Sequence, residues 1–242
     1  DSLCVNQTGG FTVAVGQSAL RNNTGGCNTA VGADAMFGNG SGTNNTAMGK
    51  FALNCNTTGT DNTAIGKDSL VTSTTGVNNT SVGASSALRL TTGSQNAMFG
   101  HNAGDNVTTG SNNVLLGESA GNDAMINVTT ASTQIVLGNN ASTNATIKID
   151  WTVTSDLRDK TEIKDVKHGL DFINQITPIE YKFKKSREDN TPTGDKKYGF
   201  KAQEILELEG DNPVIINNKD TDALKITNSH LIPVLVNAIK EL

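Results

Sequence analysis

Thr46-Ala47-Met48-Gly49 recurs as Thr63-Ala64-Ile65-Gly66, and stretches of the same kind return along the first 138 residues. Their glycines stand at positions 16, 32, 49, 66, 83, 100, 117 and 138, which is a period of 17 after the first step with one longer final spacing. A second glycine precedes each of the first seven by seven residues, from Gly9 to Gly110. A fixed period of this length is the signature of a repeat array.

Each repeat predicts a short strand of four or five residues, a glycine turn, a small apolar pair such as Ala52-Leu53, and an Asn/Thr/Gly loop. Such strands are too short to be stable alone, so their burial must come from stacking one unit on the next, with the polar loops projecting to one side. The expected fold is mainly β: a parallel β-roll or solenoid of about eight 17-residue repeats, roughly 40 Å long at about 4.8 Å per rung. Residues 145–151 predict one more strand after the last repeat.

The pattern Asn28-Thr29-Ala30-Val31-Gly32 resembles the head repeats of trimeric autotransporter adhesins, over about residues 9–140. The resemblance implies left-handed β-rolls that assemble as a homotrimer. A 17-residue coil encloses little apolar volume, so three rolls packed around an axis would supply the burial that one roll lacks. The repeat of that family is usually shorter, and this chain departs from it in loop length.

Composition divides the chain into two parts. Residues 1–154 hold 21 of the 25 glycines, no proline and 13 charged residues, whereas residues 155–242 hold all 4 prolines and 30 charged residues. We therefore expect a repetitive β-roll stem over 1–154, followed by a small α+β domain over 155–242 that ends in a long helix.

Several classes of ligand are disfavoured. The net charge of −5 includes no basic patch, and no apolar run approaches the about 20 residues of a membrane helix, so neither nucleic acid binding nor membrane insertion is expected. The three cysteines, Cys4, Cys27 and Cys55, show no metal-ligand spacing, and the repeats carry no recurring carboxylate for calcium. The glycine-rich stretch Gly38–Gly42 lacks the lysine of a phosphate-binding loop. Neither a metal nor a cofactor is expected.

In the second part, apolar spacing predicts a short helix within 167–176, a strand over 179–183, a helix over 202–208, a strand over 213–216 and a helix over 228–242. In the last helix Leu231, Leu235, Ala238 and Leu242 keep a spacing suited to a coiled-coil seam. Packing of this helix on its own domain and a trimer seam are equally compatible with the pattern.

Four motifs follow one another in this part: Ser155-Asp156-Leu157-Arg158-Asp159-Lys160, Ile176–Tyr181, Gly199–Glu204 and the helix Leu231–Leu242. Together they resemble the C-terminal intramolecular chaperone of endosialidases and phage tail fibres. The resemblance implies a catalytic dyad of Ser155 and Lys160, self-cleavage of the Thr154–Ser155 bond, and a positioning role for Asp156 and Arg158.

The implied chemistry requires the lysine to be neutral. A serine hydroxyl becomes a good nucleophile when a base removes its proton, and a lysine serves as that base only when it is neutral. With the ordinary pKa of about 10.4, roughly one lysine in 2,500 is neutral at pH 7. Burial favours the neutral form, and trimer assembly is one way to bury Lys160. Ser155 attack by an N-to-O acyl shift and lysine-assisted attack of water both remain open.

We therefore expect an autocatalytic serine endopeptidase and chaperone at the end of a trimeric viral or phage fibre or tailspike, located on the virion and binding a host surface glycan or receptor. The alternative is a bacterial trimeric adhesin at the cell surface whose last domain is a permanent cap. A glycan-degrading enzyme is disfavoured, since the stretch has no aromatic platform and no recurrent carboxylate pair. A membrane-tethered transcription factor is disfavoured by the repeats and the absence of a basic region.

Overall fold

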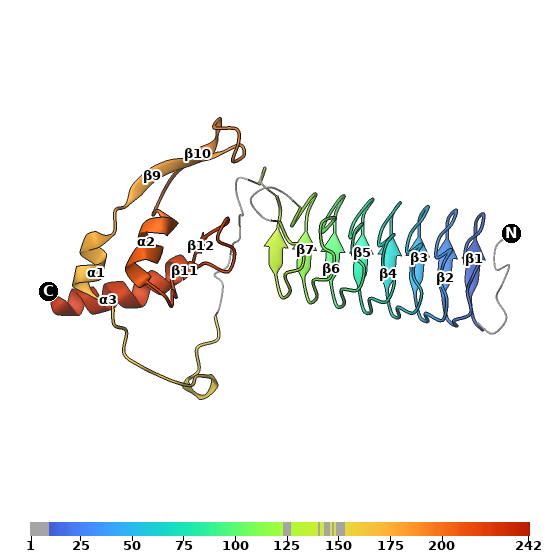
Figure 1. The fold of residues 1–242 in the computed structure, drawn as a ribbon, viewed down its shortest axis with the longest axis horizontal. Coiled ribbons are helices and arrows are strands. Elements are labelled where there is room, and N and C mark those ends of the chain that lie inside the picture. Colours follow the sequence, from blue (N-terminus) through green and yellow to red (C-terminus); the bar gives the residue numbers. More distant parts are fainter. Residues whose placement is uncertain (1–9, 123–126, 140, 143–145, 147, 149–152) are drawn as a thin grey trace. The chain divides into compact units, whose positions relative to one another are not determined.

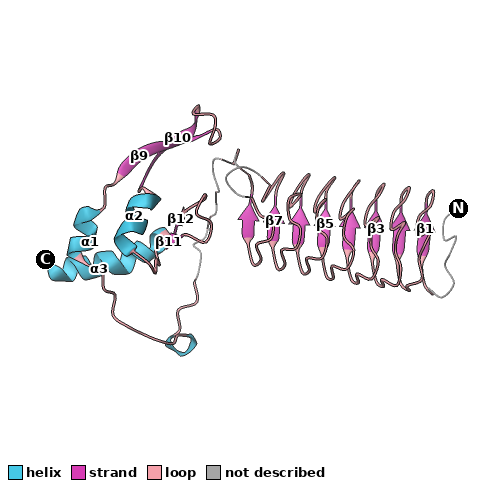
Figure 2. Ribbon diagram, viewed as in Figure 1, coloured by secondary structure: helices cyan, strands magenta, loops and turns pink. Residues whose placement is uncertain are grey.

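The computed structural model describes residues 10–122, 127–139, 141, 142, 146, 148 and 153–242 (Figure 1). The chain forms two compact units, Asp1–Ser142 and Thr143–Leu242. The first is a solenoid whose strands stack side by side, and the second contains helices and short strands (Figure 2). The strand predicted over 145–151 lies largely outside the described residues.

Eight parallel strands form the sheet of the solenoid in sequence order, so the prediction of a mainly β solenoid with 17-residue repeats is confirmed. Each strand has three residues rather than four or five, and equivalent repeat positions pair directly, as in Thr46↔Thr63 and Met48↔Ile65. The strands are β1 Val13–Val15, β2 Thr29–Val31, β3 Thr46–Met48, β4 Thr63–Ile65, β5 Thr80–Val82, β6 Ala97–Phe99, β7 Val114–Leu116 and β8 Ile135–Leu137.

The glycine after each strand is required by the stacking itself. Gly66 has φ +130°, and a Cβ there would lie 2.4 Å from the carbonyl oxygen of Gly83 on the next rung. A side chain at this position would be strained by the positive φ and would overlap the backbone of the next rung. The 17-residue glycine period therefore marks the places where the chain turns out of the sheet against its neighbour.

Most rungs of the solenoid fill their interior with one small and one large residue, at the middle of the strand and six residues later. The two sizes can change places between these positions. In the fourth rung the small Ala64 accompanies the large Leu70, whereas in the sixth the large Met98 accompanies Gly104, and all three of the side chains are fully buried. A Cβ on Gly104 would lie 2.2 Å from the Met98 sulfur. Because a void or an overlap would each be costly, the small and large residues change places together.

The polar loops were expected to project to one side, but two rows of their asparagines are buried. In the longer row, Asn62 accepts hydrogen bonds at its Oδ1 from the backbone nitrogen of Asn79 at 3.0 Å and donates from Nδ2 to Gly76 O at 2.8 Å. The same contacts repeat from rung to rung, so buried amide groups satisfy the backbone where the loops turn. The longer row comprises Asn28, Asn45, Asn62, Asn79, Asn96 and Asn113; the shorter comprises Asn23, Asn39 and Asn56.

The second unit is α+β, as predicted. Its helices are α1 Leu170–Gln175, α2 Ala202–Glu209 and α3 Leu231–Glu241, with short 3-10 helices η1 Leu157–Asp159 and η2 Asn228–His230. Its strands are β9 Ile179–Lys184, β10 Pro192–Gly199, β11 Ile216–Asn217 and β12 Lys225–Ile226. The strand expected over 213–216 is thus shorter and begins at its last residue. Strand β10 was not expected from the sequence pattern, and its polar residues pair with β9 in an exposed antiparallel hairpin.

Helix α3 packs on its own domain and also leaves a second apolar face uncovered. Leu231, Val234 and Ala238 are buried, the first two in a core with Phe172, Ile205, Ile215 and Ile216. The predicted seam is therefore wrong in its residues, because Leu231 and Ala238 are already buried within their own domain. The exposed apolar side chains of the helix are Ile232, Leu235, Val236, Ile239 and Leu242, which we call the free face of α3.

Candidate active site

The second unit contains a tight turn over residues 155–160 that an ion pair closes. Asp156 caps the 3-10 helix η1, since its carboxylate accepts a hydrogen bond from the backbone nitrogen of Arg158 at 2.9 Å. The guanidinium of Arg158 grips the same carboxylate, with Nη2 2.6 Å from Oδ2 and Nε 3.1 Å from Oδ1. These bonds from the Arg158 side chain and backbone hold the pKa of Asp156 below its ordinary value.

The turn brings together two side chains that are five residues apart. Lys160 Nζ donates a hydrogen bond to Ser155 Oγ at 2.8 Å. The backbone nitrogen of Lys160 also donates to Leu157 O at 3.2 Å, which fixes the point where the chain leaves the turn. At this distance a neutral amine could accept the hydroxyl proton, so the pair has the geometry of a nucleophile beside its base.

Within one copy of the chain the pair is open to water. Ser155 and Lys160 are both exposed. Four apolar side chains of the same segment are exposed as well, namely Val153, Leu157, Ile163 and Val166. The segment therefore carries exposed apolar side chains before and after the polar pair in the sequence.

Two other motifs of the domain are joined by a carboxylate. Glu204 of α2 accepts hydrogen bonds from the backbone nitrogen of Thr177 at 3.2 Å and from its hydroxyl at 3.0 Å. Glu209, at the end of the same helix, accepts from the backbone nitrogens of Val214, Ile215 and Ile216 at 2.7–2.9 Å. The motif residues Thr177 and Glu204 therefore join two segments of the domain. They lie outside the turn of residues 155–160. Glu209 was not singled out from the sequence, and its neighbour Gly210, which ends the helix, is the only local signal.

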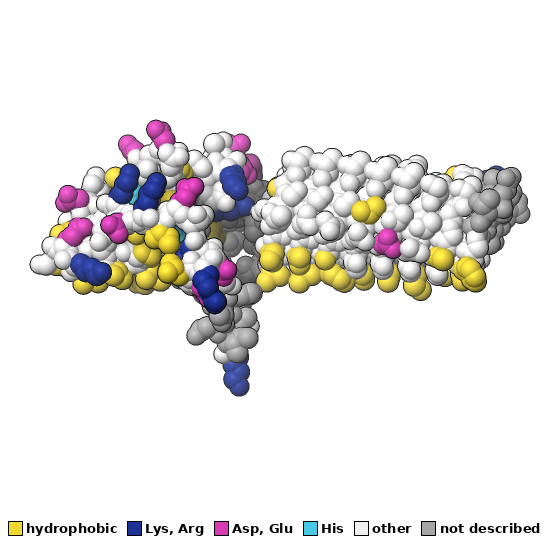
Figure 3. All heavy atoms as spheres, turned by 90° about the horizontal axis from the view of Figure 1, so that it is seen from below, with side chains coloured by type: hydrophobic (Ala, Val, Ile, Leu, Met, Phe, Trp, Pro, Cys, Tyr) yellow, Lys and Arg dark blue, Asp and Glu magenta, His cyan; other side chains and the backbone are white. Residues whose placement is uncertain are grey.

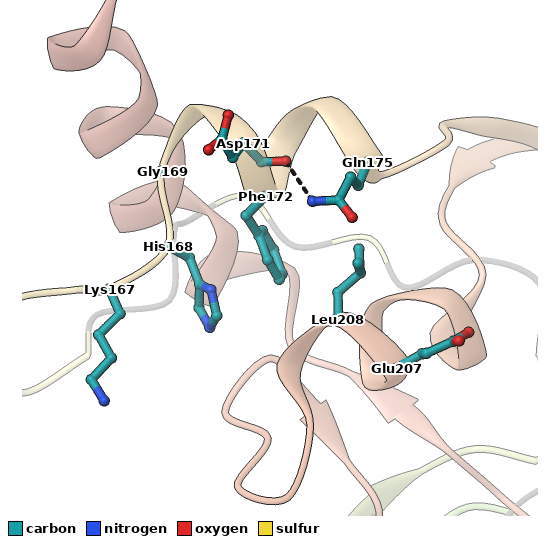
Figure 4. A pocket seen from close by; sticks show the side chains of 8 residues that line it. All are labelled: Lys167, His168, Gly169, Asp171, Phe172, Gln175, Glu207 and Leu208. Carbon is teal, nitrogen blue, oxygen red and sulfur yellow. Dashed lines mark hydrogen bonds between the residues drawn. The ribbon is translucent and has the colours of Figure 1, made fainter.

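A separate hollow of about 400 Å³ lies between the start of α1 and α2 (Figure 4). Its lining mixes the apolar Phe172 and Leu208 with His168 and Glu207, and the rings of His168 and Phe172 lie 4.3 Å apart. Neither Ser155 nor Lys160 lines this hollow. Among the residues that the structure describes, no group of three or more His, Cys, Asp or Glu side chains could hold a metal ion.

Comparison with known proteins identifies the domain. Residues 155–212 match the model of a peptidase family described as chaperone of endosialidase. The match begins at Ser155 and includes the turn of residues 155–160 and both motifs joined by Glu204. It ends before α3, although the sequence resemblance extends to Leu242. No curated protein and no solved structure was found to match the chain. The chain thus carries a chaperone of endosialidase domain after its β-solenoid repeats.

Proposed function

We propose that residues 155–242 drive the trimeric assembly of the solenoid in a viral or phage fibre or tailspike and then release themselves by cutting the Thr154–Ser155 bond. The observation that carries the proposal is the 2.8 Å hydrogen bond between Lys160 Nζ and Ser155 Oγ at the first residue of the matched domain. A peptidase family match and a serine–lysine pair at its start support the same chemistry.

In the reaction proposed for the acyl-shift route, neutral Lys160 takes the hydroxyl proton of Ser155 as Oγ attacks the carbonyl carbon of Thr154. The Thr154–Ser155 amide bond breaks as the lysine returns the proton to the Ser155 nitrogen. The product is an ester between Thr154 and Ser155 Oγ, which water hydrolyses to a carboxylate and a free serine. In the second route Lys160 activates water, which attacks the Thr154 carbonyl directly. Both routes place Lys160 as the base.

Asp156 and Arg158 act as positioning residues in this proposal. Their ion pair closes the turn that carries Ser155 at its start and Lys160 at its end. Neither side chain is hydrogen-bonded to the Ser155 hydroxyl or to the Lys160 amine in the described contacts. Both therefore support the geometry without touching the scissile bond.

A disposable chaperone suits the solenoid, because its rungs are nearly interchangeable. Equivalent positions pair along the whole sheet, so three chains placed side by side have few features that fix their mutual register. A domain that associates first would align the chains and raise their effective concentration. Once it is released, the fibre cannot retrace its folding path, and its persistence becomes kinetic. A host surface glycan or receptor is the ligand expected of such a fibre on a virion.

The test is the intact mass of freshly expressed chains. Wild type should give two fragments, residues 1–154 and 155–242, whereas Ser155→Ala should remain whole and still trimerise. Thr161→Ala changes an exposed hydroxyl of the same segment and should be cut normally. Cleavage of Ser155→Ala at the wild-type rate would remove Ser155 from the mechanism, and an intact wild-type chain would favour the permanent cap of an adhesin.

A further inference from the structure

The outward side of the solenoid sheet carries no charged residue. In every strand the middle residue points into the core, and the first and third residues point outward. We call these outward positions the outer sheet face. Its third-position row is apolar throughout: Val15, Val31, Met48, Ile65, Val82, Phe99, Leu116 and Leu137. Its first-position row holds Val13, Thr29, Thr46, Thr63, Thr80, Ala97, Val114 and Ile135.

Much of this face is open to solvent in a single chain. Met48, Phe99 and Leu137 are 44%, 40% and 57% exposed, although each is a large apolar side chain. Figure 3 shows hydrophobic side chains in a continuous row along one edge of the solenoid, next to surfaces that are almost entirely polar or neutral. Parallel sheets are normally covered on both faces, because their strands are too apolar to face water. The outer sheet face is therefore an unpartnered surface.

We propose that the outer sheet face is the surface through which identical copies of the solenoid meet around the fibre axis. This inference rests on the proposed trimeric assembly and identifies the part of the solenoid that performs it. A partner must present apolar groups at the same steps of about 4.8 Å over seven steps. A parallel copy in register does so by symmetry, placing each third-position side chain against the same position of its neighbours.

The size of the face explains why a second contact is needed. Eight strands at about 4.8 Å and three residues of about 3.3 Å give a face of roughly 380 Å² in projection, less than half of the about 800 Å² per partner of a stable interface. The sheet face alone is therefore too small to gather free chains. The free face of α3 gives the chain a second uncovered apolar surface in its other unit. A second copy of this chain carries both of these surfaces.

The decisive experiment measures the access of a thiol reagent to two positions of the same rung in the full chain. Cys4, Cys27 and Cys55 are first replaced by serine. Ile65→Cys then places a thiol on the outer sheet face, and Thr75→Cys places one on an exposed loop position of the same rung. Each variant is sized by light scattering and treated with a maleimide, and modification is followed by mass.

In trimers, the thiol introduced at position 65 should react at least tenfold more slowly than the thiol at position 75, and denaturant should make the two rates equal. Trimers in which both thiols react at the same rate would overturn the assignment of the face and leave the proposed function standing. Chains that remain monomeric would instead overturn the trimeric function, and with it this inference. The two failures are thus distinguished by the oligomeric state.

Discussion

Lys160 Nζ lies 2.8 Å from Ser155 Oγ, and both side chains are exposed in the single chain. The geometry required of a nucleophile and its base is therefore present before any surface covers the pair. A lysine can remove the hydroxyl proton only in its neutral form, and removal of water favours that form. Under the proposed function, the missing step is the removal of water, and the exposed Leu157 and Ile163 of the same segment are apolar groups that a covering surface could contact.

Replacement of the lysine tests the base. Lys160→Arg should abolish cleavage, a loss of at least 1,000-fold, because a guanidinium stays protonated at any usable pH. In wild type the single-turnover rate should rise with pH and reach a plateau, as the neutral amine becomes the main form. The matched control is Lys164→Arg in the same exposed segment, which should keep the wild-type rate. Cleavage by Lys160→Arg at that rate would exclude Lys160 as the base.

Removal of the Asp156 charge tests the positioning turn. Asp156→Asn loses the ion pair with Arg158 and should slow cleavage on the order of tenfold, since a small misplacement of reacting groups is costly. Asp159→Asn, on the same turn, should have little effect. The shape of the pH profile should not change in Asp156→Asn, and a shifted profile would indicate that Asp156 acts on the proton of the base.

The sign of the Asp156 shift fixes the pH range in which the turn weakens. Its pKa is lowered in the folded chain by the hydrogen bonds from Arg158, so the ion pair contributes at pH values above the ordinary pKa of an aspartate. That contribution is lost as the pH falls through the lowered pKa. A change of cleavage rate between pH 6 and 9 therefore cannot come from this carboxyl.

The buried asparagine row can be tested in the solenoid. Asn62→Ala leaves Gly76 O and the backbone nitrogen of Asn79 without the Asn62 side chain as their partner and should cost about 2–3 kcal/mol per chain. The released fibre of this variant should dissociate at a lower temperature on a heated gel. Thr75→Ala, at an exposed position of the same rung, should melt like wild type. Equal melting of the two variants would show that the row is dispensable.

The sequence predicted the repeats well because glycine spacing reports a backbone constraint directly. Gly66 can be recognised without a structure, since only glycine tolerates both its φ of +130° and the contact with Gly83. The buried asparagines were not predicted, because an amide side chain in an Asn/Thr/Gly loop reads as solvent-facing until its partners are known. Asn62 is buried by the asparagines of the rungs above and below it, and the composition of a single repeat does not reveal this.

Helix α3 shows a second limit of prediction from the sequence pattern. Its apolar residues were assigned to one stripe, whereas the structure buries Leu231, Val234 and Ala238 and exposes Ile232 and Leu235. A helix that is apolar on two sides gives several acceptable stripes at a spacing of three or four residues, and the pattern does not say which neighbour each stripe meets. The dyad contact was expected only from the family resemblance, because two residues five apart in a loop carry no periodic signal.

The free face of α3 offers the test of coupling between assembly and cleavage. Leu235→Asp places a charge on this face, 43% exposed in the wild type, and leaves the buried Leu231 and Val234 in their core. The domain should therefore keep its circular dichroism spectrum while the chain becomes monomeric by light scattering. If assembly removes water from the dyad, these monomers should remain uncut for many half-times of the wild-type reaction.

The matched control is Tyr198→Asp, which adds the same charge at an 86% exposed position of β10, outside the helix. It should trimerise and be cut like wild type, because β10 belongs to neither proposed apolar contact. Cleavage of Leu235→Asp monomers as fast as wild-type trimers would contradict the coupling, since the exposed lysine of a single chain would then suffice as the base. The dyad itself would remain supported in that case, because Ser155→Ala and Lys160→Arg test it independently of assembly.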